Sequence, residues 1–136
     1  YDPDSNTTYW GTAQAKPWRR DLRGSKDGAT DWANSTIALD ADTGKLKWAY
    51  NHAPGESLDL DEVFERVVVT HGDQKSILTI GKPGILWKLD ARTGKFLAAR
   101  QTVLNFKEVP RLKDVTSRLG PHRPGQTTQG ASAAAG

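Results

Sequence analysis

The sequence predicts an all-β protein built from antiparallel strands, and this prediction depends on one strand-turn-strand pattern that occurs twice. In the first copy, residues 38–48, a β-favouring run leads through Asp40 and Gly44 into a second strand, in which Leu46 and Trp48 alternate with lysines and so share the buried face. Aspartate side chains bond to nearby backbone N–H groups, and glycine adopts the positive φ that closes a turn, so the pattern predicts a β-hairpin with one buried face. Fifty residues later the pattern returns at residues 88–98, with alanine in place of the closing tryptophan.

A repeat of this period favours a β-propeller. Self-similarity at roughly 40 to 50 residues with strand-turn-strand content is typical of propeller blades, whose four-stranded sheets bury their faces only against neighbouring blades. At 136 residues the chain has room for about two blades. Because the chain starts at Tyr1 without methionine or a leader-like pattern, we expect a partial sequence.

The rest of the chain is assigned in order around the two hairpins. The first ten residues predict a strand end, a turn and a new strand through 8–11, and residues 19–31 predict a polar surface loop. Further strands are expected at residues 66–70, 76–80, 85–89 and 103–106. The valine-rich run at 66–70 predicts a buried strand.

The end of the chain departs from this pattern. Residues 120–136 contain no large aliphatic or aromatic side chain, so burial cannot offset their ordering entropy. We expect a partial propeller over residues 1–106 and a divergent, disordered tail over 107–136.

Composition excludes several functional classes. The net charge of +3 comes entirely from the last 36 residues, since residues 1–100 contain fourteen Lys or Arg and fourteen Asp or Glu. Such a mixed-sign surface argues against nucleic-acid binding. The chain contains no run of about 18 apolar residues, so it is not expected to be an integral membrane protein. It also contains no cysteine, so no disulfide or thiolate metal site can form. The histidines at 52, 71 and 122 lack ligand spacing and are expected on the surface or in loops.

Three segments contain residues suited to chemistry, and each also has an ordinary structural reading. Residues 11–18 are small residues running into a proline-bounded loop, which would let a ligand approach the backbone or would simply pack Trp18. Residues 56–65 contain five carboxylates, which fit a solvated acidic loop or a divalent-cation loop, although the EF-hand spacing is absent. Lys82 lies between two glycines, where a turn lysine would point into water.

The hairpin at residues 38–48 resembles the tryptophan-docking motif of the quinoprotein alcohol dehydrogenases. These enzymes use pyrroloquinoline quinone (PQQ), and such motifs tie their adjacent propeller blades together. We call this hairpin the first docking hairpin and its copy at 88–98 the second. Residues 11–18, GTAQAKPW, are similar to that family's GTGNPAPW segment, so that Gln14 falls on its calcium-binding asparagine. The acidic stretch is similar to the family's TPHDxWDYDGVNE segment. Asp59 there matches the catalytic aspartate and Asp61 the acidic residue two positions on, while Leu58 replaces the tryptophan.

The resemblance implies a quinoprotein-type propeller fragment that uses PQQ and calcium to oxidise an alcohol to a carbonyl. In this reading Gln14, Asp59 and Asp61 bind the metal, Asp59 is the general base and Lys82 contacts the quinone. The resemblance further implies a small-molecule alcohol substrate, a cytochrome-type electron acceptor and a periplasmic location. The rival hypothesis is a non-catalytic quinoprotein-like propeller that serves as a binding or assembly module.

Overall fold

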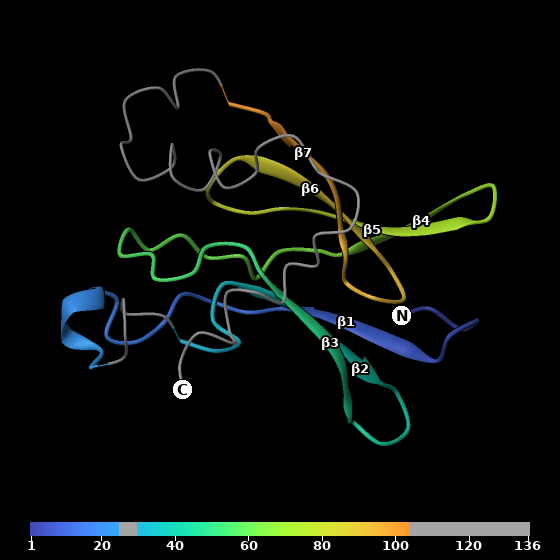
Figure 1. Cartoon of the computed structure of the whole chain (residues 1–136), viewed down its shortest axis with the longest axis horizontal. Coiled ribbons are helices and arrows are strands. Elements are labelled where there is room, and N and C mark those ends of the chain that lie inside the picture. Colours follow the sequence, from blue (N-terminus) through green and yellow to red (C-terminus); the bar gives the residue numbers. More distant parts are fainter. Residues whose placement is uncertain (25–29, 104–136) are drawn as a thin grey trace.

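The computed structural model describes residues 1–24 and 30–103, and within them the chain forms two antiparallel β-sheets (Figure 1). The first sheet has the strand order β1-β2-β3 and comprises β1 (Thr7–Gly11), β2 (Ser35–Asp40) and β3 (Leu46–Asn51). The second has the order β4-β5-β6-β7 and comprises β4 (Val67–His71), β5 (Gln74–Ile80), β6 (Ile85–Asp90) and β7 (Phe96–Gln101). A short 3₁₀ helix, η1 (Arg20–Leu22), follows β1.

These elements confirm the all-β prediction. The described residues contain no α-helix, and the second sheet has the four strands expected of a blade. The first sheet has three strands in the described part of the chain. The tail predicted over 107–136, and all but the first residue of the strand predicted at 103–106, lie outside the described residues.

The two predicted hairpin turns are confirmed and share one hydrogen-bond pattern. In the first, Asp40 Oδ1 accepts from the backbone N–H and the hydroxyl of Thr43 at 3.0 and 2.8 Å, and Gly44 N donates to Asp40 O at 2.9 Å. Asp90, Thr93 and Gly94 repeat these bonds in the second hairpin. The two glycines have φ values of 68° and 69°, which only glycine adopts without strain.

Trp48 joins the two sheets. Its indole N–H donates to Ala91 O at 3.0 Å, and its ring lies against Gly94, where a Cβ would come within 2.4 Å of the indole. Tyr9 adds a second bond, from its hydroxyl to Ala91 O at 3.0 Å. The tryptophan of the first docking hairpin therefore packs on the turn of the second, which is the arrangement that the motif predicts.

The core between the sheets is formed by aromatic and aliphatic side chains from both. Its buried members are Ala38, Trp48, Tyr50, Ile77, Ile85, Trp87, Leu89 and Ala91. Burial of such apolar surface provides most of the stabilisation of a fold of this size. The two faces therefore form one continuous core rather than two separate ones.

Two sequence-based expectations about burial were wrong. The strand predicted as buried at 66–70 is β4, an edge strand with Val67 and Val69 exposed, because only β5 pairs with it in the described residues. Leu46, expected on the buried face beside Trp48, is exposed. His52 lies in the loop after β3, which is one of the two placements expected for the histidines, but it is buried there, and its Nε2 hydrogen-bonds Thr36 Oγ1 at 2.8 Å.

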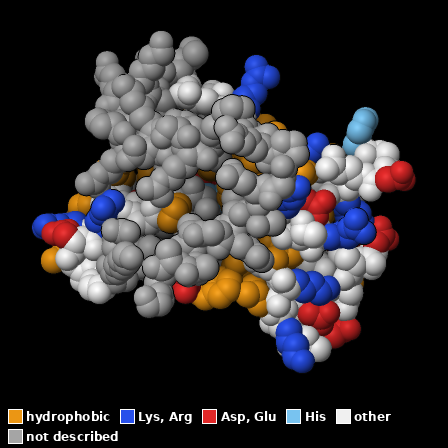
Figure 2. All heavy atoms as spheres, in the orientation of Figure 1, with side chains coloured by type: hydrophobic (Ala, Val, Ile, Leu, Met, Phe, Trp, Pro, Cys, Tyr) orange, Lys and Arg blue, Asp and Glu red, His pale blue; other side chains and the backbone are white. Residues whose placement is uncertain are grey.

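Lys and Arg side chains are interspersed with Asp and Glu side chains over the hairpin ends (Figure 2). One such contact joins the N-terminal segment to the second sheet, since Lys75 Nζ lies 2.6 Å from both Asp2 Oδ1 and Asp4 Oδ2. Among the residues that the model describes, no helix has the length and apolar character needed to cross a bilayer.

Candidate active site

Gln14, Asp59, Asp61 and Lys82 lie together, although they come from three separate parts of the chain. We call them the four-residue cluster. Gln14 follows β1, the two aspartates lie in the long connection between β3 and β4, and Lys82 lies in the turn between β5 and β6. The structure therefore brings into contact all four residues that the sequence singled out for the site.

Hydrogen bonds and ion pairs join the cluster. Lys82 Nζ lies 2.5 Å from Asp61 Oδ2 and 3.1 Å from Asp59 Oδ2. Gln14 donates through its backbone N–H to Asp61 Oδ1 at 2.9 Å and through its side-chain amide to Asp59 Oδ1 at 2.6 Å. The two carboxylates are thus held side by side by one ammonium group and one glutamine.

The two aspartates differ in exposure. Asp61 is 18% exposed at its side chain, whereas Asp59 is 56% exposed and open to a reactant. Asp59 also has a φ of 59°, an uncommon backbone conformation for a residue with a side chain, although aspartate tolerates it better than most. Residues in such conformations gather at functional sites, which agrees with the placement of Asp59 at the open side of the cluster.

The charges in the cluster reinforce one another. The hydrogen bond from Lys82 lowers the pKa of Asp61 below its ordinary value, helped by the Gln14 backbone N–H and opposed by partial burial. The bonds to Asp61 and Asp59 in turn raise the pKa of Lys82. The cluster therefore holds a carboxylate and an ammonium in their charged forms at neutral pH.

The donor set of the cluster fits a hard cation. Two carboxylates and an amide oxygen are the ligand types that calcium takes. In this structure the two carboxylates already share a positively charged partner, the ammonium of Lys82. The described residues contain no group of three His, Cys, Asp or Glu side chains arranged to hold a metal ion, so this part of the chain offers two acidic ligands.

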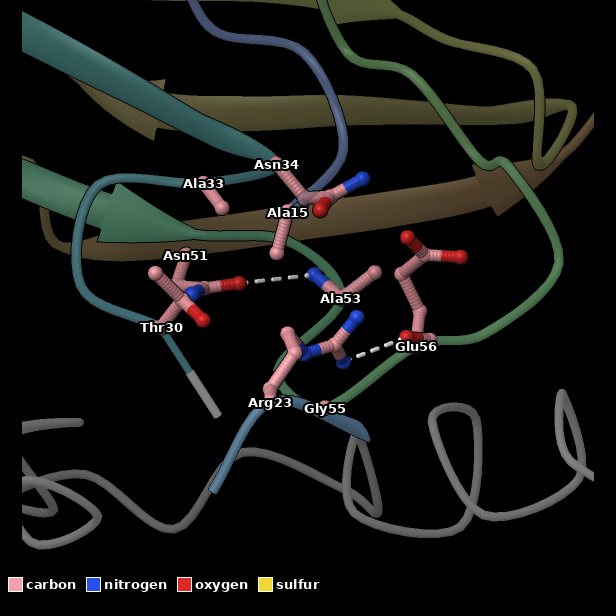
Figure 3. A pocket seen from close by; sticks show the side chains of 9 residues that line it. All are labelled: Ala15, Arg23, Thr30, Ala33, Asn34, Asn51, Ala53, Gly55 and Glu56. Carbon is pink, nitrogen blue, oxygen red and sulfur yellow. Dashed lines mark hydrogen bonds between the residues drawn. The ribbon is translucent and has the colours of Figure 1, made fainter. Parts of the chain in front are cut away.

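A small pocket is lined in part by Ala15, the neighbour of Gln14 in the chain, and by Arg23 and Glu56, which sequence reasoning missed (Figure 3). Arg23 crosses it and donates to Glu56 O at 2.7 Å, and also to the carbonyl oxygens of Pro17 and Trp18. Glu56 Oε2 accepts from the backbone N–H groups of Leu58 and Leu60, at 2.7 and 3.2 Å, on either side of Asp59. Arg23 and Glu56 therefore shape the loop that presents Asp59.

Glu62 is the other residue that the sequence did not single out. It directly follows Asp61 and is fully buried, and neither carboxylate oxygen has a hydrogen-bond partner among the described residues. Burial raises the pKa of Glu62 to about 7, although the charge of Arg66 and the nearby indole N–H of Trp87 act in the opposite direction. A run of five carboxylates gives no sign of which one is buried, so only the folded chain separates Glu62 from its exposed neighbours.

Comparison with known proteins gives a consistent assignment. The family model for the glucose/ethanol/alcohol dehydrogenase β-propeller domain (PQQ) matches residues 1–126. The chain is 35% identical over 107 residues to the quinohemoprotein alcohol dehydrogenase of Comamonas testosteroni, covering 76% of this chain and 15% of that protein. It is 32% identical over 120 residues to the lanthanide-dependent methanol dehydrogenase of Methylacidiphilum fumariolicum, covering 84% and 19%.

Solved structures show the same likeness. A europium-containing methanol dehydrogenase superimposes with a TM-score of 0.71 at 30% identity, covering 76% of this chain and 18% of that one. The crystal structure of the Comamonas testosteroni quinohemoprotein alcohol dehydrogenase gives a TM-score of 0.63 at 33% identity, covering 76% and 16%. The chain therefore spans less than a fifth of the length of each of these relatives.

Proposed function

The chain belongs to the family of PQQ-dependent glucose, ethanol and alcohol dehydrogenases, and from that premise we propose that it forms part of an enzyme that oxidises an alcohol to a carbonyl. The convergence of the four-residue cluster supports this proposal, because it brings an exposed carboxylate, a second carboxylate and a cation together at one site. A non-catalytic propeller module would not require that these residues meet.

Asp59 is the general base of the proposed reaction. An exposed carboxylate within hydrogen-bond reach of an alcohol hydroxyl can take its proton as the C–H bond breaks. Gln14 and Lys82 hold one oxygen each of this carboxylate, at 2.6 and 3.1 Å, and so fix its orientation. A base oriented before the substrate arrives loses less conformational entropy in the reaction.

PQQ and a metal ion complete the proposed site. Gln14, Asp59 and Asp61 are the residues of this chain that would bind the ion, and Lys82 would lie beside the quinone and neutralise negative charge there. When bound, the quinone supplies the two-electron acceptor and the ion supplies positive charge that makes its carbonyl more electrophilic.

Calcium is the ion that we propose, and a trivalent lanthanide is the second candidate. Two of the similar proteins are described as lanthanide-dependent and as europium-containing. The pair of carboxylates in the cluster carries two negative charges, which suits an oxygen-seeking ion of higher charge as well as calcium. Metal analysis of the complete dehydrogenase purified from medium containing both ions would separate the candidates.

The proposal extends to the electron acceptor and the location. Relatives are described as quinohemoproteins, and one, the lupanine 17-hydroxylase of a Pseudomonas species, carries cytochrome c in its description at 33% identity. We therefore propose a cytochrome-type acceptor and a periplasmic enzyme.

The test is Asp59→Asn in the complete dehydrogenase that contains this chain. Dye-linked alcohol oxidation should fall by about a hundredfold or more, because the base is lost, while PQQ remains bound. Asp73→Asn, which changes an exposed carboxylate in the β4–β5 turn, should leave the rate unchanged. Full turnover in Asp59→Asn would assign the base to another group, and the absence of alcohol oxidation in the wild-type protein supplied with PQQ and metal would favour the non-catalytic module.

A further inference from the structure

The carboxylate of Glu62 lies against the backbone of Gly81, the residue before Lys82. A Cβ at position 81 would come within 2.2 Å of Glu62 Oε2 and 2.4 Å of its Cδ. Gly81 has no positive φ, so its backbone would accept alanine. Glycine is required at position 81 because the buried carboxylate occupies the space that a side chain would fill.

Gly81 begins the turn that places Lys82. Gly84 N donates to Gly81 O at 2.9 Å, which closes the turn, and Lys82 N donates to Asp61 O at 3.1 Å. The side-chain ammonium of Lys82 also contacts the carboxylates of Asp61 and Asp59. A shift of the backbone at Gly81 would therefore move the ammonium relative to both carboxylates.

Glu62 cannot retreat easily, because its segment is also fixed on the side of the first sheet. A Cβ at Gly11 would lie 2.3 Å from Glu62 O and 2.2 Å from a terminal nitrogen of Arg66. Arg66 donates from Nε to Thr36 Oγ1 at 3.1 Å and from a terminal nitrogen to Ser35 O at 3.3 Å. The segment that carries Glu62 is thus packed against glycine on both sides.

From these contacts we infer that Glu62 is a positioning residue: its buried carboxylate, packed against Gly81, sets the turn from which Lys82 reaches Asp59 and Asp61. The inference rests on the proposed function, since it gives Glu62 a role through a residue of the proposed quinone site. Glu62 touches neither substrate nor cofactor in this role, and it acts only through the Gly81 backbone.

The test is a set of variants in the complete dehydrogenase, scored by kcat, by PQQ affinity and by thermal midpoint. Gly81→Ala forces the new methyl group onto the Glu62 carboxylate, and misplacement of Lys82 by about 1 Å should lower kcat by about tenfold to a hundredfold and weaken PQQ binding. Gly81→Ala combined with Glu62→Ala removes the collision and should recover most of the lost rate. Glu65→Ala, an exposed carboxylate of the same segment, is the matched control and should change neither kcat nor PQQ affinity.

A second cycle separates positioning of Lys82 from a general packing defect. If Gly81→Ala acts through Lys82, it should have no further effect on kcat or PQQ affinity in a Lys82→Ala background. The inference is overturned if Gly81→Ala keeps its full effect in that background, or if the double variant with Glu62→Ala recovers the thermal midpoint but not the rate. If Lys82→Ala by itself changes neither quantity, the assignment of Lys82 in the proposed function is wrong, and the role of Glu62 is overturned with it.

Discussion

Lys82 is the cation of the four-residue cluster, and its contacts define what its removal should do. Lys82→Ala in the complete dehydrogenase should lower kcat by about tenfold to a thousandfold, because a charge that stabilises the developing negative charge is lost. PQQ affinity, measured by quenching of protein fluorescence, should fall as well. Lys45→Ala, at an exposed turn position, is the control. An unchanged PQQ affinity in Lys82→Ala would place the quinone elsewhere.

His52 and Glu62 are buried ionisable residues whose pKa values move in opposite directions. Burial lowers the pKa of His52 from 6.5 to about 3, with the charge of Arg66 adding to the effect, and burial raises that of Glu62 from 4.5 to about 7. His52 therefore contributes stability that is present above pH 6.5 and is lost as the pH falls towards 3. Glu62 contributes stability that is present below pH 4.5 and is lost as the pH rises towards 7.

Between pH 4.5 and 6.5 these two dependences should cancel. Each alone changes the free energy of unfolding by about 1.4 kcal/mol per pH unit. His52→Gln should expose the Glu62 dependence, so that stability decreases with rising pH, and Glu62→Gln should expose the His52 dependence, so that stability increases. Urea denaturation at intervals of half a pH unit measures the three slopes. Equal slopes in the wild-type protein and both variants would contradict the assigned pKa shifts.

The two docking hairpins offer an internal comparison of what a tryptophan contact contributes. Gly44 and Gly94 have the same turn position and nearly the same φ, but a Cβ at Gly44 would meet nothing within 4 Å, whereas one at Gly94 would collide with Trp48. Gly44→Ala should cost about 1 to 2 kcal/mol for the left-handed conformation alone. Gly94→Ala should cost about 1 to 3 kcal/mol more, because the indole must shift.

Urea denaturation of the two alanine variants measures this difference. A larger loss for Gly94→Ala means that the contact of Trp48 with the second hairpin holds the two sheets together. If both variants lose the same stability, the indole moves aside at no cost, and Trp48 has no specific docking role in this molecule.

The hairpins were predictable from sequence because the residues that decide them are neighbours in the chain. Asp40, Thr43 and Gly44 fix a turn through bonds across four residues, and the second copy repeats them. The exposure of β4 was not predictable, because valine-rich runs form edge and central strands alike and only the sheet order distinguishes them. The burial of His52 depends in the same way on Thr36, sixteen residues away.

The residues of the candidate site also divide into those that the sequence identified and those that it did not. Gln14, Asp59, Asp61 and Lys82 were selected through matching family segments, and no spacing in the chain required that they meet. Arg23, Glu56 and Glu62 were missed, because each acts on the backbone of a distant or neighbouring segment rather than on a ligand. Contacts of this kind leave no sequence pattern, since any side chain of the right size and polarity at that place would suffice.

The described part of the molecule, residues 1–24 and 30–103, consists of two sheets of a propeller that share one core. The outer strands of both sheets have unpaired edges in the described residues, and apolar side chains on them, including Trp10, Val67 and Val69, are exposed. In a propeller such surfaces are covered by neighbouring blades. The chain also spans only 15% to 19% of the length of the relatives compared.

From this we predict that the purified 136-residue chain is catalytically silent. The four-residue cluster offers two acidic ligands and one ammonium group, so an ion bound there would keep most of its water. A partly built site does not hold its reactants at productive geometry, and an error of about 1 Å can already cost about a hundredfold in rate.

Calorimetry with PQQ and calcium, with the complete dehydrogenase as the positive control, should detect no binding to this chain. A hydrophobic dye should bind to the chain and become fluorescent, because unpaired sheet edges and uncovered apolar side chains remain accessible. Tight binding of one PQQ per chain would contradict the prediction, since it would mean that these two sheets already contain enough of the site to hold the cofactor without further blades.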